Sequence, residues 1–186
     1  GDLVKYLQDL GEQVHTVRGR WPSEEFKNSI LSLSNLDYIV NCIATTTTEG
    51  DFSINYEVPL WLDSIPDHVC KKIVYPGTDC LGEKTPYANS KLKAVRYITN
   101  SKKTKVINCS FITKRKGLLK WFLNDSGDTV DGYSDVFWNG LTSLEWFKVL
   151  IDLIKNWSTT SSIITPYSEC ISKYDLLCVM NEVFKT

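Results

Sequence analysis

Histidine is scarce in this sequence, and the cysteines are scattered along it. His15 and His68 are the two histidines and stand isolated, which removes support for a histidine-based catalytic triad or metal site. The six cysteines form neither a CxxC pair nor a Cys/His cluster, and four of them lie in or beside apolar, strand-like runs. Buried free thiols fit this pattern better than a zinc site or a disulfide framework. We therefore expect no metal in this protein.

The sequence also lacks any long charged or long apolar run. Its 21 basic and 22 acidic residues give a net charge of -1, so we expect neither nucleic acid nor a membrane surface as a partner. No stretch reaches the apolar length of a bilayer span, and the opening GDLVKYLQDLG lacks the basic start and cleavage site of a signal peptide. These features indicate a cytoplasmic protein whose partner is a small molecule or another protein.

What the sequence does contain is an alternation of helix-like and strand-like segments in a chain of 186 residues, enough for one sizeable core. We expect helices over residues 2–10, from 22, over 55–65 and over 87–100, and strands over 13–17, 36–44, 71–79 and 104–112. Pro59 restricts its helix to starting or kinking near that point. The segment 36–44, LDYIVNCIA, is apolar almost throughout, as a strand buried on both faces of a parallel sheet should be. The rhythm predicts an α/β fold, with strands ending at Val17, Ala44, Pro76 and Phe111 side by side.

Beyond residue 112 the pattern changes. Residues 117–127 are amphipathic, and a Trp-rich turn with a long helix follows. Thr142 with Glu145, and less clearly Ser172 with Asp175, have the spacing of a capping box, which predicts the starts of two late helices. Most tryptophans here read as packing residues, whereas Trp138 is the best suited to line a cleft.

In a parallel sheet of this kind, ligands bind at the carboxyl ends of the strands. Tyr87 and Lys91 lie four residues apart at the start of the helix that follows the third strand, so the fold brings them to the same edge as Thr78. Spacing alone does not decide their role, because residues four apart share a face of any helix. A surface Tyr–Lys pair, with Thr78 as an ordinary turn residue, is the alternative.

The chain resembles the extended short-chain dehydrogenase/reductase superfamily at several motifs. NCIA, NYEVP, GTDC and YANSK stand in the expected order, and the later WNGLTSLEWFKVL and ISKYDLL resemble the substrate-binding half of the dTDP-4-dehydrorhamnose reductase branch. The resemblance implies a Rossmann-like doubly wound sheet over residues 1–112 and a small substrate-binding part over 113–186. It also implies an NAD(P)H-dependent reductase of a 4-keto-6-deoxy sugar nucleotide, acting in nucleotide-sugar and cell-surface polysaccharide biosynthesis.

The resemblance assigns roles to individual residues. Tyr87 would protonate the ketone oxygen, Lys91 would stabilise the phenolate and bind the nicotinamide ribose, and Thr78 would orient the ketone. An arginine after the first strand accommodates a 2′-phosphate, which favours NADPH over NADH. The cofactor-binding candidates are Gly1, Arg18, Arg20, Asn41, Ala44, Tyr87, Lys91 and Ser110, and the substrate-binding candidates are Thr46, Asp79, Trp138 and Thr142.

The sequence departs from the family pattern in several places. The first strand and the glycine-rich phosphate loop should precede residue 2, so Gly1 is either the last glycine of that loop or a remnant of cloning. Asn108 stands where the family has arginine, and the segment between Thr78 and Tyr87 is short. Two explanations follow: a longer working reductase, or a non-catalytic cofactor-binding or regulatory module of the same fold. The sugar nucleotide and the oligomeric state stay open, with a homodimer as one option.

Overall fold

A computed structural model describes residues 1–17, 19–46, 50–113, 117–124, 127 and 129–184. The chain divides into two compact units, Gly1–Asn108 with Leu150–Thr165, and Cys109–Val149 with Pro166–Thr186. The helices are α1 (Asp2–Asp9), α2 (Glu24–Leu31), α3 (Ile54–Ser64), the 3-10 turn η1 (Cys80–Gly82), α4 (Pro86–Ile98), α5 (Gly117–Asn124), α6 (Ser143–Lys155) and α7 (Lys173–Phe184). The strands are β1 (Ile39–Val40), β2 (Ile73–Pro76), β3 (Thr104–Ile107), β4 (Phe111–Ile112), β5 (Phe137–Trp138), β6 (Leu141–Thr142), β7 (Ile163–Ile164) and β8 (Ile171–Ser172).

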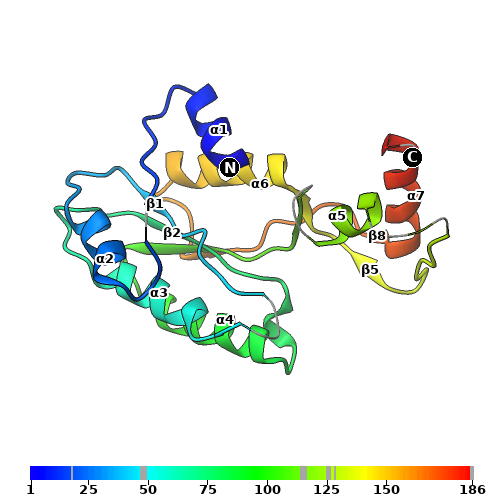
Figure 1. Ribbon diagram of the computed structural model, residues 1–186, viewed down its shortest axis with the longest axis horizontal. Helices are drawn as coiled ribbons and strands as arrows, with labels where there is room; N and C mark the ends of the chain where they lie inside the picture. The colour runs from blue at the N-terminus through cyan, green and yellow to red at the C-terminus, as the bar shows by residue number, and fades with distance from the viewer. Residues whose placement is uncertain (18, 47–49, 114–116, 125–126, 128, 185–186) are drawn as a thin grey trace. The chain divides into compact units, whose positions relative to one another are not determined.

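The first unit is built on a parallel four-stranded sheet in the order β1-β2-β3-β7. Helices α3 and α4 lie together along one side of this sheet, and the C-terminal half of α6 lies on the other (Figure 1). Alternate residues of a strand point to opposite faces, so Tyr75 and Val106 pack against Ala94, Val95 and Ile98 of α4. The predicted α/β fold with a parallel sheet and helices on both faces is therefore confirmed.

Two predicted strands are wrong. Residues 13–17 have no regular secondary structure and pair with no strand among the described residues, and a segment without a hydrogen-bonded neighbour is not a strand. The segment 36–44 forms only the short strand β1, which ends at Val40 instead of Ala44 and lies at the edge of the sheet. Its apolar residues indicated a strand buried on both sides, but among the described residues its backbone pairs only with β2 and, through an isolated bridge of Leu36, with Cys70.

The predicted fourth strand, residues 104–112, is divided in two. β3 ends at Ile107, and Phe111–Ile112 forms a separate strand, β4, which pairs with β6 in the second unit. Helix α3 also differs from the expectation, because it begins at Ile54 and continues through Pro59. The other helix predictions hold: Ser23 caps α2, Thr85 caps α4, and Thr142 and Ser172 each accept a hydrogen bond from the backbone three residues on.

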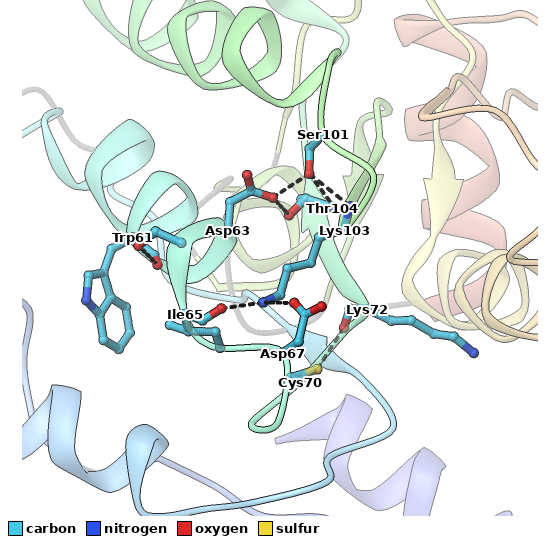
Figure 2. A network of polar contacts seen from close by, with 10 residues as sticks. Trp61, Asp63, Ile65, Asp67, Cys70, Lys72, Ser101, Lys103 and Thr104 are labelled. Carbon is cyan, nitrogen blue, oxygen red and sulfur yellow. Dashed lines mark hydrogen bonds and ion pairs between the residues drawn. The ribbon is translucent and has the colours of Figure 1, made fainter.

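A polar network at the amino end of the sheet joins the end of α3 to the start of β3 (Figure 2). One carboxylate oxygen of Asp63 accepts hydrogen bonds from the hydroxyls of Ser101, at 2.5 Å, and Thr104, at 2.6 Å. The Lys103 ammonium donates to the carbonyl of Ile65 and to Asp67. These contacts satisfy polar groups where the helix ends, so they fix the position of α3 against the sheet.

In the second unit, Leu119 of α5 packs against Leu176 and Met180 of α7, with Trp138 and Ile171 at the margin of the cluster. None of the described helices has the length and apolar character needed to cross a membrane. None of the six cysteines, all of which lie in the described part of the chain, forms a disulfide, and only Cys70 and Cys109 are buried. Burial as a general property of the thiols was therefore a wrong prediction.

Candidate active site

Thr78 lies two residues after the carboxyl end of strand β2, which ends at Pro76. Thr78 is 5% exposed, and its hydroxyl accepts a hydrogen bond from the backbone N–H of Cys80 at 3.3 Å and contacts Asp79 Oδ1 at 3.4 Å. The side chain of Thr78 also lowers the pKa of the Tyr87 phenol, so the two groups are neighbours. The structure therefore brings together two of the three residues that the sequence predicts to be catalytic.

Helix α4 holds Tyr87 in its first turn. The side chain of Thr85 accepts a hydrogen bond from the N–H of Ala88 at 3.1 Å, and Pro86 occupies the first helical position, where a missing N–H costs no hydrogen bond. The ring of Phe52 packs edge-on against the Tyr87 ring, with centroids 6.4 Å apart. Tyr87 is thus half-buried, with a fixed backbone and a packed ring.

The environment of Tyr87 keeps its proton in place at neutral pH. Burial raises the pKa of the phenol, the hydrogen bond from Thr78 lowers it, and the neighbouring Cys80 and Asp79 raise it. The net effect is a pKa above the usual value of 10.0. A phenol with a raised pKa remains protonated at neutral pH and can act as a proton donor.

Lys91 lies one helical turn after Tyr87 and is 3% exposed. Its ammonium donates to the backbone carbonyl of Pro76 at 2.9 Å and lies 4.5 Å from the centroid of the Tyr75 ring. Burial lowers the pKa of Lys91 to about 8. The contacts of this ammonium within the described residues are thus with the end of β2, and the predicted contact with the Tyr87 phenol is not among them.

Asn55 links three elements around this site, although the sequence analysis gave it no role. Its amide bonds to both backbone groups of Thr45, at 2.9 and 3.0 Å, and donates to the hydroxyl of Ser90 at 3.0 Å. The carbonyl of Asn55 accepts from the Tyr75 hydroxyl at 2.8 Å, and Pro59, four residues on, has no N–H to offer that carbonyl. Asparagine four positions before proline in an apolar helix was the available signal.

Asn41 lies at the end of β1 and is 4% exposed. Its side-chain oxygen accepts from the N–H of Ile43 at 3.1 Å, whereas its side-chain N–H group is buried without a partner. Ala44, Thr46 and Asp79 are exposed. The carboxyl end of β1 therefore holds one unsatisfied donor, which is unusual for a buried polar group.

The remaining predicted cofactor residues lie elsewhere. Arg18 falls outside the described residues, Arg20 is exposed just before α2, and Gly1 is exposed at the start of α1. In the second unit, the Trp138 indole donates to the Ser110 hydroxyl at 3.1 Å, and Thr142 accepts from the N–H of Glu145 at 3.2 Å. Two residues predicted to bind different ligands, Ser110 and Trp138, are thus hydrogen-bonded to each other.

No protein-family model matches the sequence, and no curated protein matches it. Solved structures do match it. A hypothetical dTDP-4-dehydrorhamnose reductase from Sulfolobus tokodaii has a TM-score of 0.74 at 18% identity, covering 100% of this chain and 80% of that one. A dTDP-4-dehydrorhamnose reductase from Clostridium acetobutylicum has a TM-score of 0.78 at 16% identity, covering 98% of this chain and 75% of that one. The enzyme WbmG from Bordetella bronchiseptica, solved in complex with NAD, has a TM-score of 0.69 at 12% identity, covering 100% and 74%.

The chain shares their fold. The Rossmann-like α/β architecture expected from the sequence motifs is therefore confirmed, and the fold resemblance to dTDP-4-dehydrorhamnose reductases with it. At identities of 12% to 18%, the likeness concerns the fold, because function depends on the residues of the site.

Proposed function

We propose that this protein is an NAD(P)H-dependent reductase of the short-chain dehydrogenase/reductase type, acting on a 4-keto-6-deoxy sugar nucleotide. The observation that carries the proposal is the placement of Tyr87 near the buried side chain of Thr78, just after the carboxyl end of β2, with Lys91 buried one turn further along α4. A hydroxyl that orients a ketone oxygen and a phenol that protonates it are the two groups that carbonyl reduction requires from a protein.

The residues at this edge fit the nicotinamide end of a cofactor. Lys91 has three N–H groups, and Pro76 is the one hydrogen-bond acceptor that the described residues offer its ammonium, so donors remain for ribose hydroxyls. Asn41 keeps a buried amide N–H without a partner. When bound there, a reduced nicotinamide would supply the hydride for the ketone carbon.

The chain's own residues would orient the ketone, protonate its oxygen and stabilise the phenolate that remains. Thr78 donates a hydrogen bond to the ketone oxygen and so places it beside the phenol, and Tyr87 transfers its proton to that oxygen as the negative charge develops. A nearby ammonium then stabilises the phenolate that remains, which is the role we assign to Lys91. Burial of Tyr87 keeps the proton on the phenol until this step, because the phenolate is disfavoured.

Finer assignments belong to the same proposal. We assign Thr46, Asp79, Trp138 and Thr142 to the sugar nucleotide, Gly1, Asn41, Ala44 and Ser110 to the cofactor, and Arg18 and Arg20 to a 2′-phosphate that selects NADPH. The dTDP-4-dehydrorhamnose reductase structures support the substrate class, and the NAD complex of WbmG supports a nicotinamide cofactor. Residues 1–112 would bind the cofactor and residues 113–186 the substrate.

The test is to offer the full-length protein NADPH and a panel of 4-keto-6-deoxy sugar nucleotides. Stopped-flow measurement of NADPH oxidation then reports whether any member is reduced. Turnover of at least one member supports the proposal. If the protein binds NADPH but turns over no member of the panel, a non-catalytic cofactor-binding module of the same fold replaces it. If it binds neither NADPH nor NADH, both readings fail.

A further inference from the structure

Position 77 requires glycine because a neighbouring side chain leaves no room for a Cβ atom, and not because of its backbone conformation. A Cβ atom built on Gly77 would lie 1.9 Å from the side-chain oxygen of Asn108 and 3.0 Å from its Cγ atom. Real Cβ atoms essentially never come within 3.0 Å of another heavy atom, so any larger residue at position 77 would displace the Asn108 amide. The amide of Asn108 therefore occupies the place that a side chain at position 77 would take.

Asn108 is held in this place from both sides. Its backbone N–H donates to the carbonyl of Ile164 at 2.8 Å, and the N–H of Gly77 donates to the carbonyl of Ile107 at 2.8 Å, so both residues extend the ladder of the sheet. Asn108 is 7% exposed, and its side-chain oxygen is buried without a hydrogen-bond partner. A buried acceptor that makes no hydrogen bond has a free-energy cost, so its place against Gly77 calls for an explanation.

The backbone beside this amide leads directly into the site. The carbonyl of Pro76, before Gly77, accepts from the Lys91 ammonium, and the side chain of Thr78, after it, lowers the pKa of the Tyr87 phenol. Gly77 thus lies between the two groups that contact α4, and glycine is the residue whose backbone is least restricted. The hydrogen bond of its N–H to Ile107 holds this residue in the sheet, and the Asn108 amide packs where a side chain would otherwise lie.

We propose that Asn108 is a positioning residue, whose amide packs against Gly77 and thereby sets where the Thr78 hydroxyl lies relative to the Tyr87 phenol. The catalytic consequence rests on the function proposed above, whereas the positioning itself can be measured without turnover. Asn108 is not among the described groups that shift the pKa of the Tyr87 phenol, which are Thr78, Cys80 and Asp79. An effect of Asn108 on Tyr87 is therefore relayed through Thr78.

The measurement is a fluorine NMR titration of the protein with its nine tyrosines replaced by 3-fluorotyrosine, whose phenol is more acidic than that of tyrosine. The resonance of residue 87 is the one absent from Tyr87→Phe. Asn108→Ala should raise the titration midpoint of this resonance by about 0.5 to 1 unit, the size expected for loss of one hydrogen bond. Thr78→Val should raise it by the same amount, and Asn108→Ala should add nothing in the Thr78→Val protein.

A second pair of variants tests the contact from the other side. Gly77→Ala should raise the same midpoint because its methyl group displaces the amide, and Gly77→Ala with Asn108→Ala should raise it no further than either change alone, because both remove the same contact. Val74→Ala, a buried change in β2 on the other face of the sheet, controls for general loosening and should lower stability without moving the midpoint. The proposal is overturned if Asn108→Ala leaves the midpoint unchanged, if it acts equally in the Thr78→Val protein, or if the shifts of Gly77→Ala and Asn108→Ala add. A protein that shows these shifts yet reduces no sugar nucleotide would refute the proposed function and leave the positioning role standing.

Discussion

The phenol of Tyr87 is half-buried in the first turn of α4, and the buried Thr78 side chain is among the groups that shift its pKa. Tyr87→Phe removes only the hydroxyl, so fold and cofactor affinity should be retained. Turnover should fall by about 10²–10⁴-fold, the usual contribution of a general acid. Stopped-flow kinetics and a cofactor titration measure the two effects separately.

Tyr97→Phe is the matched control for this change, because Tyr97 lies on the same helix and is 52% exposed. It should leave turnover unchanged. Activity of Tyr87→Phe equal to that of the parent would remove Tyr87 from the mechanism.

Lys91 gives stability a defined pH dependence. Its pKa is lowered from 10.5 to about 8 in the folded protein, so between these values the unfolded chain binds more protons than the folded one. Stability conferred by the neutral amine therefore rises with pH across this window. Relative to Lys91→Met, the free energy of unfolding of the parent should increase by up to about 3 kcal/mol from pH 8 to pH 10.5.

Urea unfolding of both proteins at several pH values measures this difference, and titrations common to both cancel. Lys93→Met controls for removal of a lysine from α4, because Lys93 is an exposed residue of the same helix whose ammonium lies over the Tyr56 ring. A difference that falls with pH, or stays flat, would mean that the buried ammonium is not destabilised as described.

Residue identity and spacing in the sequence were enough to predict that Thr78 and Tyr87 lie near each other at one edge of the sheet, because both follow recognisable secondary-structure boundaries. They were not enough for Asn55 or Asn108. The role of Asn55 depends on Thr45 and Ser90, and that of Asn108 on Gly77, all of which are distant in sequence and meet only in the folded sheet. The contacts of the Lys91 ammonium likewise depend on the Pro76 carbonyl, which no side-chain pattern reveals.

At the scale of elements, the helices were easier to predict than the strands. Caps such as Ser23 and Thr85 act within three residues, so the sequence itself marks the helix starts. A strand exists only when its backbone pairs with another, and the apolar segment 36–44 carries no information about how many neighbours it has. This is why residues 13–17 were wrongly predicted as a strand and why β1 was wrongly placed inside the sheet.

The Asp63 network gives a prediction at this scale. Asp63→Ala leaves the hydroxyls of Ser101 and Thr104 without their acceptor and should lower the free energy of unfolding by about 2 kcal/mol, as hydrogen bonds to a charged group are lost (Figure 2). Asp63→Asn keeps an oxygen in the same place and should cost less. Urea denaturation measures both, with Ser64→Ala as an exposed control in the same turn. Equal losses for the Ala and Asn variants would show that shape, and not hydrogen bonding, fixes this helix end.

At the scale of the whole molecule, the chain leaves the first unit after Asn108 and returns to it at Leu150. The return adds β7, which pairs with β3 through Val106 and Ile107. Its two residues, Ile163 and Ile164, are too few to show a strand pattern, so the sequence analysis placed no strand there. Local sequence patterns therefore could not predict that the chain returns to the first unit and adds a strand to its sheet.

Cofactor binding should stabilise the folded molecule as a whole, because a ligand that binds only the native state shifts the unfolding equilibrium by mass action. NADPH at about 100 times its dissociation constant adds about 2.7 kcal/mol, which for a chain of this length raises the melting temperature by roughly 5–10 °C. The shift should persist in Tyr87→Phe, since only the proton donor is removed.

Arg18→Ala and Arg20→Ala, singly and together, should reduce the shift of the melting temperature with NADPH and leave the shift with NADH unchanged, because only NADPH carries the 2′-phosphate. Equal shifts with both cofactors in all four proteins would refute the assignment of these arginines, and no shift with either cofactor would refute cofactor binding itself.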